Sequence, residues 1–210
     1  MVFKHPFTLL VTGPTGSGKT QFVTNLLLNA DSMINKTIDR IIYCYGIYLK
    51  ETFDLLKKHF SKIEFIEGID DNIQFNPKVN NFIILDDLMN DGVKSDTVSN
   101  LLTRGSHHLN LSVILLTQNL FHKGKNSRSI NLNCQYLAYF KNPRDLSQIN
   151  HLARQMYPKK SGVLIEACKD ATKKPYGYLL LDLKQDTDEN CRLRTNIFPS
   201  DKQSFIYIPK

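Results

Sequence analysis

The sequence has little of what marks secreted, metal-binding or membrane-spanning proteins. It has no tryptophan and four scattered cysteines, Cys44, Cys134, Cys168 and Cys191, none of them in a C-x-x-C pair. Such cysteines are typical of reduced thiols in an intracellular protein, not of a disulfide framework or a zinc site. Aliphatic runs fall well short of the ~18 residues that a membrane span needs, and the N-terminus predicts a strand instead of a signal peptide. We therefore expect an intracellular protein with no membrane partner.

Internal repeats, heptads and low-complexity tracts are also absent, which excludes solenoids and coiled coils. With 210 residues and 41 % hydrophobic content, the chain can bury one substantial α/β core. Its 27 Lys and Arg against 20 Asp and Glu give a net charge of +7. This excess favours a polyanionic partner such as nucleic acid, although nucleotide-binding proteins of other kinds are basic too.

The most informative stretch fills every fixed position of the phosphate-loop pattern G-x-x-x-x-G-K-[ST]. A β-rich apolar run, residues 7–12, precedes it, and residues 21–28 carry apolar side chains at helical spacing. Strand, loop and helix thus follow one another in the order that phosphate binding requires. We predict that ATP binds to this loop, which consists of Gly13, Pro14, Thr15, Gly16, Ser17, Gly18, Lys19 and Thr20.

The residue types of the loop explain the predicted chemistry. Glycines let backbone N–H groups turn toward phosphate oxygens, and the helix N-terminus adds partial positive charge. Lys19 would reach the β- and γ-phosphates, and the Thr20 hydroxyl would ligate Mg²⁺. The alternative is a glycine-rich turn without a ligand, but the four fixed positions match by chance in roughly one such chain in a hundred.

Two carboxylates end a nearly continuous apolar strand predicted over residues 81–87. Ligands of open α/β sheets bind at the carboxyl ends of the strands, so Asp86 and Asp87 should face the phosphates. Asp86 would hold Mg²⁺, directly or through water, and Asp87 would orient or deprotonate the attacking water. The alternative is a strand that ends in a capped, solvated loop.

A second apolar strand, predicted over residues 110–119, ends at Thr117 and Gln118. Gln118 sits where a γ-phosphate sensor belongs. Its alternative role is an amide that satisfies backbone groups at the end of a strand.

The remaining patterns predict a chain in which strands and helices alternate. The polar stretch 184–190 would end the compact core, so we divide the chain into an ATPase domain, residues 1–183, and a tail, residues 184–210, that packs on it or on a neighbouring subunit. Further strands are predicted over residues 39–45, 63–66, 135–140 and 177–182, and helices over residues 51–58, 95–104, 146–156 and 161–168.

Together these motifs resemble the genome-packaging ATPases of the FtsK/HerA superfamily, over nearly the whole chain. The chain is similar to those of Polinton/Maverick elements, adintoviruses and virophages, and more distantly to those of poxviruses. The most specific segments are residues 103–108, 117–125 with Arg128, and 140–145. The resemblance implies that Lys19 and Thr20 are the Walker A pair and Asp86 the Walker B aspartate, with Gln118 ending the fourth core strand. Asp87 stands where family members often have Glu, and its carboxylate reaches about one C–C bond less far.

The family also implies a homo-oligomeric ring whose subunits complete each other's ATP sites with an arginine supplied in trans. Arg104 is the first candidate for this arginine and Arg128 the second; for each, a surface cation is the alternative. The basic loop 122–128 would grip duplex DNA through Lys123, Lys125 and Arg128, or would be an ordinary solvated loop. Capsid vertex proteins would be further partners.

These observations predict an α/β fold: a P-loop NTPase of the additional-strand type, with a mostly parallel central sheet flanked by helices. The predicted function is a motor that hydrolyses ATP, with Mg²⁺, to translocate double-stranded DNA into a viral capsid. It would act in the cytoplasm or nucleus of an infected cell, or in the virion. The alternatives are a translocase of the same superfamily that serves segregation or conjugation, a nucleoside or small-molecule kinase, and a non-catalytic nucleotide-gated module.

Overall fold

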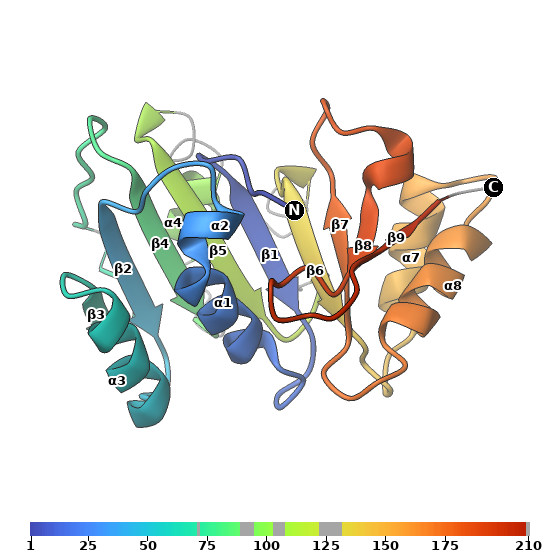
Figure 1. Cartoon of the computed structure of the whole chain (residues 1–210), viewed down its shortest axis with the longest axis horizontal. Coiled ribbons are helices and arrows are strands. Elements are labelled where there is room, and N and C mark those ends of the chain that lie inside the picture. Colours follow the sequence, from blue (N-terminus) through green and yellow to red (C-terminus); the bar gives the residue numbers. More distant parts are fainter. Residues whose placement is uncertain (71, 89–94, 103–107, 122–131, 209–210) are drawn as a thin grey trace.

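A computed structural model of the chain describes residues 1–70, 72–88, 95–102, 108–121 and 132–208 (Figure 1). Every strand and helix predicted above is present in the described part, with ends that shift by a few residues. Residues 103 and 104 of the predicted helix 95–104 lie outside the described part. The elements α2, η2, β8 and β9 were not predicted. The strands are β1 (Thr8–Thr12), β2 (Arg40–Tyr45), β3 (Glu64–Glu67), β4 (Asn81–Asp86), β5 (Leu111–Thr117), β6 (Tyr136–Phe140), β7 (Tyr178–Asp182), β8 (Leu193–Thr195) and β9 (Phe205–Tyr207). The helices are α1 (Lys19–Leu28), α2 (Ala30–Met33), α3 (Lys50–His59), α4 (Ser95–Asn100), α7 (Ser147–Met156), α8 (Gly162–Ala171) and the 3-10 turn η2 (Glu189–Cys191).

The nine strands of the described residues form one sheet in the order β3-β2-β4-β5-β1-β6-β7-β8-β9. The pairs from β3 to β6 are parallel, and the pairs that add β7, β8 and β9 are antiparallel. Because β5 lies between β1, which precedes the phosphate loop, and β4, which ends in the acid pair, the additional-strand prediction is confirmed.

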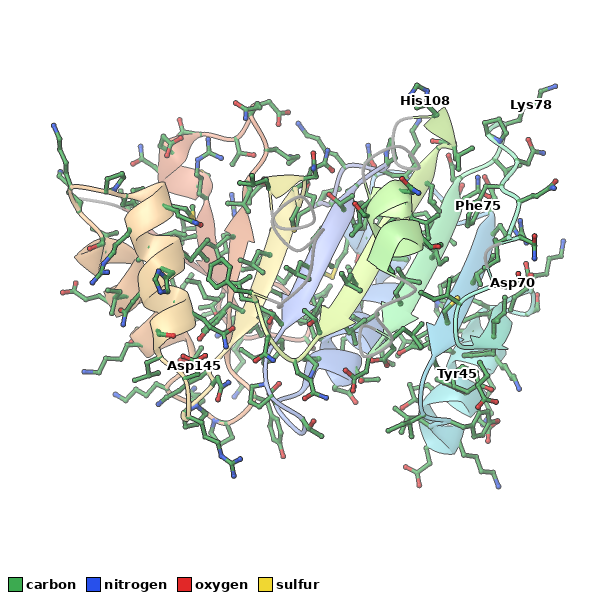
Figure 2. All side chains as sticks on the ribbon, turned by 180° about the vertical axis from the view of Figure 1, so that it is seen from behind. Tyr45, Asp70, Phe75, Lys78, His108 and Asp145 are labelled. Atoms are coloured by element: carbon green, nitrogen blue, oxygen red, sulfur yellow. The ribbon has the colours of Figure 1, made fainter. Side chains whose placement is uncertain are left out.

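Helices cover both faces of the sheet, which explains why its central strands read as unbroken apolar runs. In β1, Leu9 and Val11 pack into one core with α1, α2 and α3, whereas Leu10 packs into the other with α4, α7 and α8. Figure 1 looks onto the first face and Figure 2 onto the second. Since every β1 residue is buried, a polar substitution there would leave an unsatisfied group inside one of the two cores.

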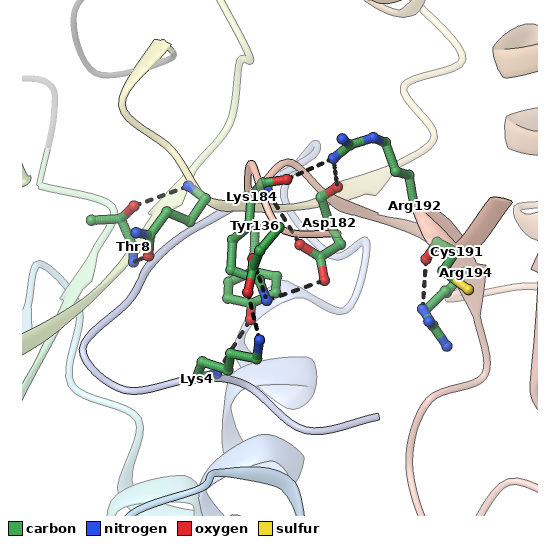
Figure 3. Close-up of polar contacts among 10 residues, drawn as sticks. Lys4, Thr8, Tyr136, Asp182, Lys184, Cys191, Arg192 and Arg194 are labelled. Atoms are coloured by element: carbon green, nitrogen blue, oxygen red, sulfur yellow. Dashed lines mark hydrogen bonds and ion pairs between the residues drawn. The ribbon is translucent and has the colours of Figure 1, made fainter. Parts of the chain in front are cut away.

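A polar network fastens the stretch after residue 183 to the sheet (Figure 3). The Lys184 ammonium lies 3.7 Å from Asp182 Oδ2 and sits over the Tyr136 ring, 5.3 Å from its centroid. Arg192 donates to the backbone carbonyls of Asp182 and Lys184 at 3.1 and 2.8 Å. Beyond it, β8 and β9 extend the sheet, and Leu193 is fully buried. The division of the chain at residue 183 stays a prediction.

The structure also bears on the expectations about membrane spans and cysteines. In the described ranges, no helix combines the length and apolarity that crossing a bilayer would require. All four cysteines are free, and burial raises the pKa of the Cys44, Cys134 and Cys168 thiols to about 12, so these three remain protonated near neutral pH.

Candidate functional site

The phosphate loop lies where β1 ends and α1 begins, at the edge of the sheet shared by the carboxyl ends of the parallel strands. Gly16 and Gly18 have positive φ of 76° and 105°, a region that glycine enters without steric cost. Gly13 is needed for a different reason, because a Cβ there would lie only 2.6 Å from Phe140 Cβ on β6. The loop is thus tightly packed on β6 while its backbone curves at the start of a helix, where anions bind.

Lys19 places its charge inside this loop. Its Nζ donates to the carbonyl oxygens of Gly13 at 2.7 Å and Pro14 at 3.1 Å, and its side chain is 9 % exposed. Burial lowers the pKa of Lys19 below its ordinary value, while the nearby Asp87 and Asp86 charges act in the opposite direction. A buried cation of this kind gains stabilisation from an anion such as a phosphate.

Asp86 ends β4 and faces α1 across the end of the sheet. Its Oδ2 accepts hydrogen bonds from the Tyr43 hydroxyl at 2.7 Å and from Thr20 Oγ1 at 3.4 Å. Burial raises the pKa of the Asp86 carboxyl, and the Tyr43 hydrogen bond offsets part of that rise. The structure therefore brings together the two predicted metal ligands and adds a third residue that the sequence analysis missed.

Tyr43 comes from β2, which pairs with β4, and its side chain is fully buried. Burial followed by the Asp86 charge raises the pKa of the phenol, so the hydroxyl stays a donor. A tyrosine in a buried strand is expected to find a partner for its hydroxyl. That general signal was readable in the sequence, but the partner was not, because it depends on β2 lying next to β4.

Oxygen donors from Thr20 and Asp86 suit Mg²⁺, which usually binds through one or two carboxylates together with substrate phosphates. Over the described residues, no group of three or more His, Cys, Asp or Glu side chains is arranged to hold a metal ion. The residues present thus fit a hard cation whose coordination is completed by phosphate oxygens and water.

Asp87 and Gln118 follow the neighbouring strands β4 and β5 and meet at their ends. Gln118 Nε2 donates to Asp87 Oδ2 at 2.9 Å, and Asp87 has a positive φ of 55°. Non-glycine residues in that region are uncommon and cluster at functional sites. The amide fixes the orientation of the carboxylate that was predicted to act on water.

The remaining predicted site residues are four basic side chains. Arg104, Arg128, Lys123 and Lys125 lie outside the described residues. Their roles stay predictions from the sequence.

The loop and the acids open into one groove of about 1040 Å³. Lys19, Thr20, Asp86 and Asp87 line one end of it. The other end is lined by the turn between α8 and β7 and by residues between Thr195 and Tyr207, which sequence reasoning did not connect with the site.

The profile of the poxvirus A32 protein family matches residues 1–167 of this chain. This match confirms the resemblance derived from the motifs. No curated protein sequence matches the chain significantly.

The genome packaging NTPase B204 from Sulfolobus turreted icosahedral virus 2, solved in complex with ATP-gammaS, has a similar structure. It is 15 % identical, with a TM-score of 0.54 over 98 % of both chains, and supports the fold. The cytoplasmic domain of EssC is also 15 % identical, with a TM-score of 0.48 over 97 % of this chain and 40 % of that one.

Proposed function

This chain belongs to the poxvirus A32 protein family, and we propose that it is a motor ATPase that moves double-stranded DNA into a viral capsid. The observation that carries the proposal is the convergence of a complete phosphate loop with Asp86, Asp87 and Gln118 at one edge of the sheet. The whole-chain likeness in fold to a viral genome packaging NTPase, solved with an ATP analogue, supports it. Activity inside an infected cell follows from this role.

In the proposed reaction, water attacks the γ-phosphorus, the bond to the β–γ bridging oxygen breaks, and the products are ADP and phosphate. Backbone N–H groups of the loop and the Lys19 ammonium hold the phosphates and stabilise developing charge. Asp87 orients the water and accepts its proton. Thr20 and Asp86 would hold Mg²⁺, which would supply charge neutralisation at the phosphate oxygens.

Gln118 links this chemistry to the rest of the motor. Its amide contacts Asp87 on one side, and the basic loop begins only four positions later along the chain. A γ-phosphate that competes for the amide would alter both the catalytic carboxylate and the path of the chain toward Lys123, Lys125 and Arg128. We infer that these cations contact the DNA backbone without reading sequence.

A ring of identical subunits completes the proposal, with Arg104 or Arg128 acting in the neighbour's site. Arg104→Ala subunits mixed with Lys19→Ala subunits should then recover part of the activity, because some interfaces pair an intact loop with an intact arginine. Mixed rings that form but stay inactive for both arginines would refute the trans arrangement.

The proposed function is tested by measuring ATP hydrolysis with and without duplex DNA together with the oligomeric mass. We expect DNA of any sequence to stimulate turnover, with affinity that falls steeply with salt. Replacing Lys123, Lys125 and Arg128 by Ala should flatten the plot of log affinity against log salt by about three units, at roughly 0.9 per phosphate contact. Transfer of phosphate to a small acceptor, or an absence of turnover, would contradict the proposal.

A further inference from the structure

The groove continues well past the phosphate loop, and its far end is formed by three strands that run antiparallel to their neighbours. Tyr178 begins β7 beside the end of β6, Thr195 ends β8, and Phe205 begins β9 opposite Thr195. Each of these residues lines the groove, at the same edge of the sheet as the phosphate loop. At about 1040 Å³ the groove is as large as whole-ligand sites, which span ~300–1,000 Å³.

An aromatic ring stands at the boundary between the two ends. Tyr176, in the turn between α8 and β7, is 72 % exposed, and a Cβ on Gly18 would lie 3.4 Å from both its Cβ and its Cδ1. Its φ of 61° is rare for a bulky residue and strains the backbone. A large, exposed ring is therefore held directly beside the phosphate loop.

The turn that carries Tyr176 is fixed by backbone hydrogen bonds. Lys173 N donates to Asp170 O, and Gly177 N donates to Lys174 O, both at 3.1 Å. Gly177 has no room for a side chain, because a Cβ there would lie 2.5 Å from Ala171 O. The strained position of Tyr176 is thus imposed by its surroundings before any ligand binds.

The rest of this end is aromatic and polar. Beneath it, the rings of Phe22, Tyr178 and Phe198 pack edge to face, with centroids 4.8–6.1 Å apart. On the far wall the Tyr207 hydroxyl donates to Asp170 Oδ2 at 2.8 Å. Aromatic faces with hydrogen-bonding groups at the rim suit a flat heteroaromatic ligand.

We propose that this end is the nucleobase subsite and that Tyr176 stacks on the base of the nucleoside triphosphate. The inference rests on the proposed function, which puts the triphosphate in the loop that Tyr176 borders. Base–aromatic stacking contributes ~1–3 kcal/mol per base. Tyr176, Tyr178 and Phe198 come after residue 167, outside the segment that the A32 family profile matches.

Affinity for ATP and for inorganic tripolyphosphate separates base contacts from phosphate contacts. Tyr176→Ala should weaken ATP binding by about tenfold and leave tripolyphosphate binding unchanged, because stacking acts only on the base. Tyr176→Phe should restore most of the lost affinity. Leu132→Ala is the matched control, since Leu132 is equally exposed (71 %) and lies before β6, at the opposite edge of the sheet.

Unchanged ATP affinity in Tyr176→Ala would overturn the inference, as would an equal loss for ATP and tripolyphosphate. These results differ from a failure of the proposed function, in which the wild-type protein would not turn over ATP or would transfer its phosphate to a small acceptor.

Because the chain has no tryptophan, the fluorescence of an introduced indole gives a second, direct measurement. In Tyr176→Trp the single indole should be quenched by ATP, through stacking with the base, and should respond far less to tripolyphosphate. Leu132→Trp should respond to neither. Equal responses of the Tyr176→Trp protein to both compounds, or equal responses of the two variants to ATP, would overturn the inference.

Discussion

The two ends of the groove are built in opposite ways. The phosphate end takes its loop from one continuous stretch, residues 13–20, and it holds the buried Lys19 and the half-buried Asp86 and Asp87. The base end is gathered from the α8–β7 turn and from β8 and β9, and its contacts are mostly aromatic. The phosphate end thus relies on charge and on residues close together in the sequence. The base end relies on apolar packing between residues far apart in the sequence.

The two ends also differ in their effect on the stability of the fold. Burial shifts the pKa of Lys19 down and that of Asp86 up, so both charged forms are disfavoured inside the fold. The packed rings at the base end instead contribute favourable contacts, ~0.5–1.5 kcal/mol per aromatic pair beyond area burial. The unfavourable charges therefore lie at the proposed phosphate and Mg²⁺ site, and the favourable packing lies beside it.

The largest expected effect comes from a substitution that acts on the phosphate end alone. Lys19→Ala should weaken the binding of both ATP and tripolyphosphate and abolish hydrolysis, because it deletes the cation inside the loop. The control is Lys62→Ala, an exposed lysine shortly before β3. Retained tripolyphosphate affinity in Lys19→Ala would mean that the phosphates bind elsewhere.

A second change separates binding from turnover within the phosphate end. Asp87→Asn keeps an oxygen that accepts from Gln118 but cannot take a proton, so ATP affinity should persist while turnover falls about 10²–10⁴-fold. Nucleotide titration and steady-state hydrolysis measure the two effects. Wild-type turnover in this variant would show that Asp87 is not the catalytic carboxylate.

A third change tests the contact that the sequence did not reveal. Tyr43→Phe removes the hydrogen bond to Asp86 and should raise the Mg²⁺ concentration for half-maximal hydrolysis by about tenfold, as expected when a metal ligand loses its supporting partner. ATP affinity without Mg²⁺ should stay constant. Tyr139→Phe, at a buried tyrosine in the other core, is the matched control. Equal Mg²⁺ requirements in the two variants would show that Tyr43 does not support Mg²⁺ binding.

The smallest expected effect is on stability. Because burial raises the folded-state pKa of Asp86 above its ordinary 3.8, ionisation costs the folded protein more than the unfolded chain. That penalty is absent below the pKa of the unfolded chain. It develops as the pH rises from that value through the raised pKa of the folded protein, and it persists at neutral pH. Without nucleotide, Asp86→Asn should therefore raise Tm at neutral pH, with a gain that shrinks on acidification. A lower Tm than that of wild type, with exposed Asp54→Asn unchanged, would contradict this account.

Sequence reasoning reached the fold because the central strands are buried on both faces and separated by helices, a pattern visible in the chain itself. It also predicted that Asp86, Asp87 and Gln118 lie at the ends of their strands, since parallel strands bring their carboxyl ends to one edge. It overlooked β8 and β9, which are only three residues long and too short for a periodic signal.

By itself the sequence determined the phosphate loop, because eight contiguous residues and their flanking strand and helix are set by local backbone geometry. Only the tertiary structure decided which side chains surround it. Tyr43 meets Asp86 because β2 lies beside β4, and Tyr176 meets Gly18 because the chain returns through α8 to an antiparallel β7. The first pair is separated by 43 positions along the chain and the second pair by 158. Contacts over such separations depend on strand order, and no local pattern encodes that order.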